Sequence, residues 1–141
     1  MRLISISLTI LFSSNVLAFC FDEAGKRYNV NPELLKSIAK VESALNPKAM
    51  NYSNSNGTYD IGLMQINSTW LKKLSEFNIT ESDLINDPCT NVNVGAWILS
   101  SNFASNGYNK KSLGAYNAGF GKNREGARNR YIGKVEDKFY K

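Results

Sequence analysis

The chain has 141 residues, of which 43% are hydrophobic, and its formal net charge is +5. This length supports one compact domain with its own core and argues against a second independent domain. The sequence contains no histidine. That excludes a Ser-His-Asp triad, a Cys-His pair and the usual zinc sites, so any catalysis must come from carboxylates, hydroxyls and amides.

The N-terminal segment, residues 1–18, is predicted to be a secretory signal peptide. Met1-Arg2 is followed by a short apolar stretch, and the small side chains of Val16 and Ala18 indicate cleavage after Ala18. The apolar stretch is shorter than the roughly 20 residues that a membrane-spanning helix needs. We therefore expect an exported mature chain, residues 19–141, that forms one domain without a membrane span.

Two cysteines, Cys20 and Cys89, remain in the predicted mature chain. Exported proteins meet an oxidising compartment, which favours a disulfide between them. Such a bond would close a loop of about 70 residues and would pin the mature N-terminus to the core. Two free buried thiols are the alternative, because spacing along a sequence does not establish pairing.

The first half of the domain is predicted to contain two helices and a short hairpin. An Asn31-Pro32 cap opens a helix that is expected to end near Asn46-Pro47. Residues 48–60 are rich in Asn, Ser, Gly and Tyr, which indicates a short irregular hairpin. A second helix is expected from Ser68 to Phe77, because its apolar residues recur at helical spacing.

The second half is predicted to be helical throughout. The run Thr80-Glu81-Ser82-Asp83 resembles a capping box that opens a short helical turn. Asp87-Pro88 caps the longest helix, which is expected to end near Asn106-Gly107. Two shorter helices follow, one over residues 110–117 and one that starts near Asn129. The apolar stripe of the longest helix, which we assign to the core, consists of Cys89, Val92, Ala96, Leu99 and Phe103.

Basic residues are in excess in residues 122–141, at the end of the chain. Basic surfaces often bind nucleic acid, but an exported protein seldom meets it, so no nucleic-acid partner is expected. Attraction to an anionic extracellular polymer fits the predicted export better, and a solvated helix face is the alternative.

Glu42 stands out because it lies on the apolar face of the first predicted helix, four residues after Ile38 and seven after Leu35. A carboxyl group among apolar side chains is poorly hydrated, which raises its pKa, and the negative end of the helix dipole acts in the same direction. A carboxyl that stays protonated near neutral pH can serve as a general acid. The alternative is that Glu42, close to the helix end, simply reaches solvent.

Four short motifs carry a resemblance to lytic transglycosylases. The stretch Gly62-Leu63-Met64-Gln65 resembles the Gly-Leu-Met-Gln motif of that family, and three further motifs occur with it in the family's order. These three are Glu42-Ser43, Asn93-Val94-Gly95 and Ala115-Tyr116-Asn117-Ala118-Gly119. The resemblance implies a mainly α, lysozyme-like α+β fold: a single helical domain with a small irregular β element flanking the active-site cleft.

A second resemblance concerns Asp60. The stretch from Asn56 to Asp60, followed by Gly62 to Ser68, is similar to the segment of chicken-type lysozymes that holds their second catalytic carboxylate. Most lytic transglycosylases manage with one carboxylate, so Asp60 is a departure from their pattern. A second carboxylate near the cleaved bond would stabilise a positively charged sugar ring or act as a nucleophile. An Asp that only fixes its own turn is the alternative.

Carried over residue by residue, the resemblance implies that Glu42 acts first as the catalytic acid and then as a base. The substrate-binding residues that it implies are Ser43, Met64, Gln65, Tyr116 and Asn117. Met64 as plain core and Asn117 as part of a helix stop are the structural alternatives. For Asn93 and Gly95 we favour packing, since a Gly within a helix often permits close contact with a neighbour.

The resemblance implies cleavage of the β-1,4 bond between N-acetylmuramic acid and N-acetylglucosamine in peptidoglycan, with 1,6-anhydro ends. A lysozyme-type hydrolase of the same bond and a non-catalytic, cell-wall-binding secretion scaffold are the alternatives. The run from Cys20 to Gly25 resembles the small subgroup that accompanies type III or type IV secretion machines, so a secretion-system component is an expected partner. We expect a periplasmic monomer that binds peptidoglycan glycan strands and needs no metal or other cofactor.

Overall fold

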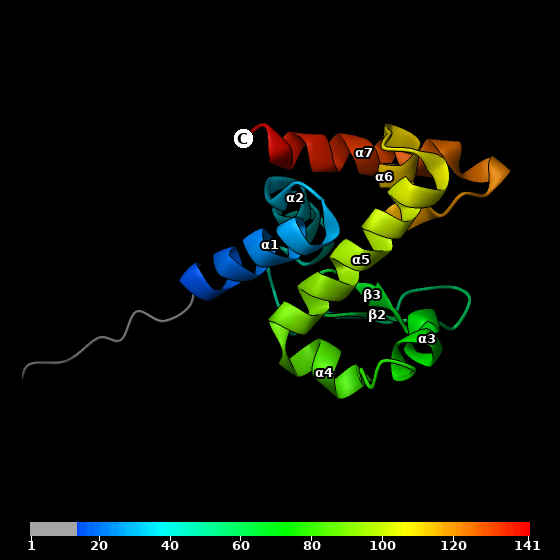
Figure 1. Ribbon diagram of the computed structural model, residues 1–141. Helices are drawn as coiled ribbons and strands as arrows, with labels where there is room; N and C mark the ends of the chain where they lie inside the picture. Colours follow the sequence, from blue (N-terminus) through cyan, green and yellow to red (C-terminus); the bar gives the residue numbers. More distant parts are fainter. Residues whose placement is uncertain (1–13) are drawn as a thin grey trace, which may run out of the picture.

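The computed structural model describes residues 14–141, with side chains from Cys20 onward. Residues 1–13 of the predicted signal peptide lie outside this part. Over the described residues the chain forms seven α-helices and a three-stranded sheet. Long α5 passes through the middle, with α1 and α2 on one side, α6 and α7 across one end, and the sheet with α3 and α4 at the other (Figure 1). None of the described helices combines the length and apolar character that crossing a membrane requires.

Helix α1, Ser14–Tyr28, is an element that the sequence analysis did not predict. It buries Phe21 and Ala24, which are three residues apart, and packs against α5. The predicted disulfide is present in the structure: it joins Cys20 to Cys89, whose Cα atoms are 5.3 Å apart. The new N-terminal helix is therefore fixed to the central helix both by apolar packing and by a covalent bond.

Helix α2, Pro32–Ser43, begins as predicted. The Asn31 side chain accepts a 2.9 Å hydrogen bond from the Glu33 N–H, and Pro32 occupies the first helical position, where its missing N–H costs nothing. The helix ends earlier than the expected Asn46, because Ala44 and Leu45 have φ angles of 52° and 62°. A left-handed backbone cannot continue a right-handed helix, so Glu42 lies in the last turn of α2.

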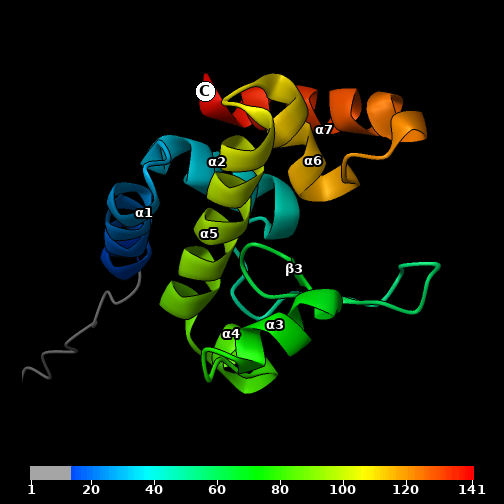
Figure 2. The ribbon, with the colours of Figure 1, turned by 45° about the vertical axis from the view of Figure 1, so that its right-hand side comes forward.

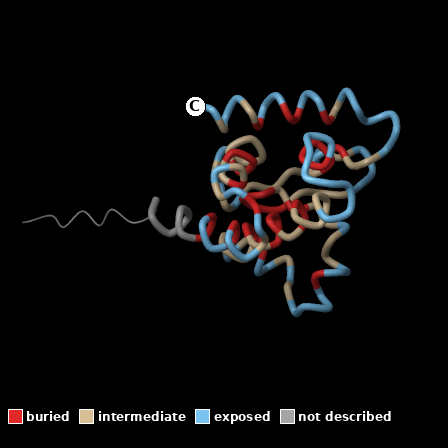
Figure 3. Tube along the Cα trace, turned by 45° about the horizontal axis from the view of Figure 1, so that its top comes forward, coloured by how far each residue is buried: buried red, intermediate tan, exposed pale blue. Residues whose placement is uncertain are grey.

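Helix α5, Pro88–Asn106, has the predicted bounds. The Asp87 side chain accepts a 2.9 Å hydrogen bond from the Cys89 N–H, and Gly107, with φ 84°, ends the helix. Its burial extends beyond the predicted stripe, and buried residues gather towards the centre of the molecule (Figure 3). The reason is that α1, α2, α4, α6 and β3 all contact it, so it has no broad solvated face over its middle turns. Its buried residues are Asn91, Val92, Val94, Gly95, Ala96, Ile98 and Leu99.

The β element is an antiparallel sheet in the order β1-β2-β3, with strands Met50–Asn51, Asp60–Ile61 and Ile66–Asn67. The predicted hairpin corresponds to β1 and β2, and β3 was not predicted, since two residues are too few to show alternation. The loop between β1 and β2 projects from the sheet (Figure 2). Positive φ angles at Gly62 and Gln65, 74° and 51°, turn the chain tightly between β2 and β3.

The segment after the sheet differs in part from the prediction. The helix expected over residues 68–77 is a 3₁₀ turn, Ser68–Trp70, followed by α3, Leu71–Ser75. The Thr80 capping box is confirmed: its hydroxyl accepts a hydrogen bond from the Asp83 N–H, and the Asp83 carboxylate accepts one from the Thr80 N–H. It opens α4, Glu81–Asn86.

Helices α6 and α7 form the end of the domain that covers α2. Helix α6, Lys110–Ala118, ends before Gly119 as predicted. Helix α7, Glu125–Phe139, begins earlier than the expected Asn129. Buried Arg128 explains the early start, because its guanidinium donates 2.9 Å hydrogen bonds to the carbonyls of Gly119 and Gly121 and so fixes the first turn of α7 to the preceding loop. Helix α7 packs against both α6 and α2.

Candidate active site

A polar cleft of about 690 Å³ is lined by residues from the helical part and from the sheet. The structure brings together in this cleft five of the residues predicted from sequence: Glu42 from α2, Asp60 from β2, Gln65 from the β2–β3 turn, and Tyr116 and Asn117 from α6. Both predicted carboxylates therefore face the same cavity. The other residues that line it are Asn51, Asn54, Ser55, Asn56, Thr58, Ile66, Asn67, Trp70, Ile98 and Arg124.

Glu42 is the strongly perturbed acid of this cleft. Burial raises its pKa from 4.5 to about 7, since the charged form loses hydration. The Tyr131 hydroxyl acts against this increase, the negative charge of Asp60 adds to it, and Lys134 and the Asn117 amide lower the pKa slightly. Glu42 can therefore hold its proton close to neutral pH, which is the condition that a general acid needs.

Helix α7 contributes to this burial, because its residues Tyr131 and Lys134 lie beside Glu42. It lies across α2 (Figure 1), and its Tyr131 side chain is only 4% exposed. Burial and the neighbouring Glu42 charge hold the pKa of Tyr131 well above its usual range, so its phenol stays a neutral donor. The sequence analysis did not assign Tyr131 to the site, because an aromatic residue on the apolar side of a helix normally belongs to the core.

Asp60 is held by three asparagine amides of the β element. Its Oδ1 accepts a 2.7 Å hydrogen bond from Asn67, and its Oδ2 accepts bonds of 3.0 Å from Asn54 and 3.2 Å from Asn51. The hydroxyl oxygen of Thr58 accepts from the same Asn54 and Asn67 amides, which orients them. These asparagines were not predicted as site residues, although the Asn-rich composition of residues 48–60 was the available signal.

Ser43 and Met64, two of the predicted substrate-binding residues, lie behind the cleft wall. The Ser43 hydroxyl donates a 2.7 Å hydrogen bond to the Leu63 carbonyl and so joins α2 to the β2–β3 turn. The Met64 side chain is fully buried, and its N–H donates to Asn91. Met64 thus belongs to the core, which was the alternative considered from sequence.

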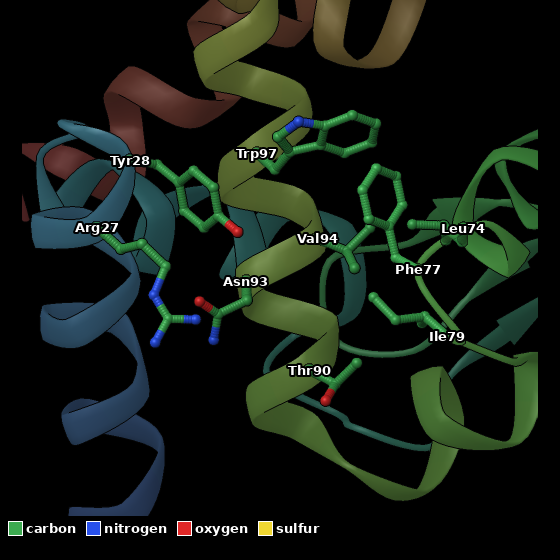
Figure 4. A pocket seen from close by; sticks show the side chains of 9 residues that line it. All are labelled: Arg27, Tyr28, Leu74, Phe77, Ile79, Thr90, Asn93, Val94 and Trp97. Carbon is green, nitrogen blue, oxygen red and sulfur yellow. The ribbon is translucent and has the colours of Figure 1, made fainter.

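Gly95 of α5 has the packing position expected for it. A Cβ on Gly95 would come within 2.9 Å of the Met64 side chain, so only glycine lets α5 approach the β2–β3 turn this closely. Asn93 lines a different, mainly apolar hollow of about 300 Å³ between α1, α5 and the α3 region (Figure 4). Neither carboxylate lines this hollow. Its residues are Arg27, Tyr28, Leu74, Phe77, Ile79, Thr90, Asn93, Val94 and Trp97.

The chain is similar to known proteins of one family over most of its length. Residues 19–139 match the transglycosylase SLT domain. The chain is 42% identical over 132 residues to the invasion protein IagB of Salmonella typhimurium, which covers 94% of this chain and 82% of that protein. It is 44% identical over 102 residues to protein IpgF of Shigella flexneri, a match that covers 72% of this chain and 66% of that protein. It is 35% identical over 141 residues to a peptidoglycan-binding-like protein of Escherichia coli O157:H7, covering 96% and 84%.

The fold also matches a solved structure. The X-ray structure of an inactive mutant of the lytic transglycosylase Slt from Pseudomonas aeruginosa aligns with a TM-score of 0.68 and 22% sequence identity. The match covers 86% of this chain but only 23% of that one, so it shows a shared lysozyme-like fold over one part of a longer enzyme. The chain belongs to the transglycosylase SLT domain family and is a peptidoglycan lytic transglycosylase.

Proposed function

We propose that this enzyme cleaves the β-1,4 bond between N-acetylmuramic acid and N-acetylglucosamine, with Glu42 as the catalytic acid, and leaves 1,6-anhydro ends. The observation that carries the proposal is the pKa of Glu42, raised to about 7 in a polar cleft that also contains Asp60, Gln65, Tyr116 and Asn117. An acid in this state can give up a proton and take one back at neutral pH.

In the first step, the Glu42 carboxyl donates its proton to the bridging oxygen, and the bond from that oxygen to C1 of N-acetylmuramic acid breaks. The departing N-acetylglucosamine keeps the proton as a hydroxyl, and positive charge develops on the muramic acid ring. In the second step, the Glu42 carboxylate takes the proton of the C6 hydroxyl as the C6 oxygen bonds to C1. The acid is thereby restored, and no water is consumed.

Asp60 supports this chemistry as a fixed negative charge. Three of the roughly four lone-pair directions of its carboxylate are already used by asparagine amides. A carboxylate held in this way is better suited to stabilise a positively charged ring through space than to rotate and attack C1. We therefore assign Asp60 to stabilisation of the ring cation rather than to covalent catalysis.

Hydrolysis of the same bond is the second candidate function, and it is the shared cleft of Glu42 and Asp60 that favours it. Two carboxylates on opposite sides of a glycosidic bond are the arrangement that lysozyme-type enzymes use. Delivery of water to C1 in place of the C6 hydroxyl would leave a reducing end.

We further propose that residues 1–18 are removed on export and that the mature enzyme acts in the periplasm, where it opens the wall locally for a secretion apparatus. The length and apolar character of the N-terminal segment support export. The disulfide between Cys20 and Cys89 supports an oxidising compartment. The similarity to the invasion protein IagB supports the link to secretion.

The test is digestion of purified peptidoglycan by the mature chain, followed by mass spectrometry of the released fragments. Anhydro products, each one water lighter than the hydrolytic product, are expected from the wild type. Glu42→Gln should fold normally and lose at least about a hundredfold in rate, and Asp60→Asn should lose about tenfold. Reducing ends would establish hydrolysis, and a fully active, folded Glu42→Gln would refute the role of Glu42.

A further inference from the structure

A second, smaller cavity of about 210 Å³ adjoins Glu42 on the side of α7. Glu42 and Asn117 line both this cavity and the main cleft, so both spaces border the proposed catalytic acid. We call this space the α7 cavity. Its lining residues are Val41, Glu42, Asn117, Ala127, Arg130, Tyr131 and Lys134.

The α7 cavity carries two positive charges and a polar donor. Arg130 and Lys134 are four residues apart on α7, so they project from the same face of the helix. Among the residues that the structure describes, neither forms a salt bridge, although Lys110, Lys138 and Lys141 nearby all do. The buried Tyr131 hydroxyl also lines this cavity, beside the Glu42 carboxyl. Such a set of groups is suited to a carboxylate.

The substrate offers a carboxylate in the right neighbourhood. N-acetylmuramic acid carries its stem peptide through a lactyl group on C3, two ring carbons away from the C1 atom whose bond breaks. A sugar placed with this bond at Glu42 therefore presents its peptide close to Glu42. The stem peptide bears free carboxylates, and the α7 cavity has room for one of them with the few carbon atoms that carry it.

We propose that the α7 cavity binds a stem-peptide carboxylate of the N-acetylmuramic acid at the cleaved bond, with Arg130 as its main ligand, so that the enzyme prefers peptide-bearing over peptide-free glycan. The inference rests on the proposed function, because it assumes that the cleaved bond lies at Glu42. It adds a substrate determinant that the main cleft does not contain. Arg130 is suited to this role because its planar guanidinium can hold both oxygens of a carboxylate.

The test compares kcat/KM for three soluble glycan preparations of matched length. One carries its stem peptides, one has been stripped of them by an amidase and the lactyl carboxylate that this leaves on C3 has then been amidated, and one carries stem peptides whose carboxylates have been chemically amidated. We expect the wild type to cleave the first about tenfold more efficiently than the other two, which is the usual effect of one charge-assisted contact. In Arg130→Gln this ratio should fall to about one, and Arg130→Lys should retain part of it.

Lys26→Gln is the matched control, because it removes one exposed positive charge from α1 and should keep the wild-type ratio. Equal cleavage of all three substrates by the wild type would overturn the inference and leave the proposed function standing. A preference that persists with amidated stems, or in Arg130→Gln, would overturn it as well. Cleavage of none of the three would refute the proposed function and this inference with it.

Discussion

The Tyr116 hydroxyl donates a 2.9 Å hydrogen bond to the main-chain carbonyl of Met64. This bond connects α6 to the β2–β3 turn across the cleft that contains Glu42 and Asp60. Burial, together with the charges of both carboxylates, holds the pKa of Tyr116 well above its usual range, so the phenol remains a donor. Tyr116 thus fixes the relative position of the two walls of the cleft, in addition to lining it.

Tyr116→Phe should therefore weaken the domain as well as the active site. The Met64 carbonyl would lose its partner in a partly buried place, and we expect the free energy of unfolding in urea to fall by about 1 kcal/mol. Tyr140→Phe is the control, because Tyr140 is 81% exposed and should show no loss. Equal stability of Tyr116→Phe and wild type would mean that the hydrogen bond does not hold the cleft walls together.

Glu42→Gln should change the pH dependence of stability. The pKa of Glu42 is about 7 in the folded state and near 4.5 when unfolded, so the folded state holds the proton more tightly. Wild-type stability should then be complete below pH 4.5 and should fall by about 2–3 kcal/mol as the pH rises to about 7. Glu42→Gln lacks this loss. Its stability relative to wild type should therefore be greater at pH 8 than at pH 4 by about 2–3 kcal/mol. If urea unfolding gave the same difference in stability between wild type and Glu42→Gln at pH 4 and at pH 8, the raised pKa of Glu42 would be contradicted.

The rate of glycan cleavage should decrease above pH about 7, because Glu42 must be protonated to act as the acid. Lys134 lowers the pKa of Glu42, so Lys134→Met should move this alkaline limb to higher pH. Lys138→Met, one turn further along α7 in an exposed ion pair with Asp137, should leave the limb in place. The profile is best measured on peptide-free glycan strands. If the alkaline limb moved to lower pH in Lys134→Met, the positive charge of Lys134 would not be lowering the pKa of Glu42.

Gly95→Ala should destabilise the domain. The added Cβ would lie within 2.9 Å of the Met64 side chain, which is fully buried and cannot move aside freely. We expect a loss of about 1–3 kcal/mol in thermal or urea unfolding. Gly133→Ala on α7 is the matched control, because nothing lies within 4 Å of its Cβ position and alanine favours a helix. Similar effects at the two positions would rule out close packing as the reason for Gly95.

The starts of α2, α4 and α5 could be predicted from sequence because each depends on local interactions. The side chains of Asn31, Thr80 and Asp87 bond to backbone groups two or three residues further along the chain. The early end of α2 was not predictable in the same way. Ala44 and Leu45 are ordinary helix residues, and they adopt left-handed φ angles only because the chain must turn into the sheet.

Elements and positions that depend on contacts between distant residues were not predicted from the sequence. The two-residue strand β3 shows no alternation, and its partners are set by pairing with β2. Helix α1 begins at Ser14, within the predicted signal segment of residues 1–18, and the apolar run of that segment dominated the interpretation of this region. Met64 was taken with its motif as a cleft residue. The tertiary structure buries its side chain against Gly95 instead.

The sequence by itself determined the candidates for the chemistry. The absence of histidine left only carboxylates, helical spacing placed Glu42 on an apolar face, and four motifs in order indicated the family. Only the tertiary structure decided that Glu42 is poorly hydrated, because the covering side chain, Tyr131, comes from a helix near the other end of the chain. Hydration depends on all the atoms that surround a group in space, and spacing within one helix describes only a part of them.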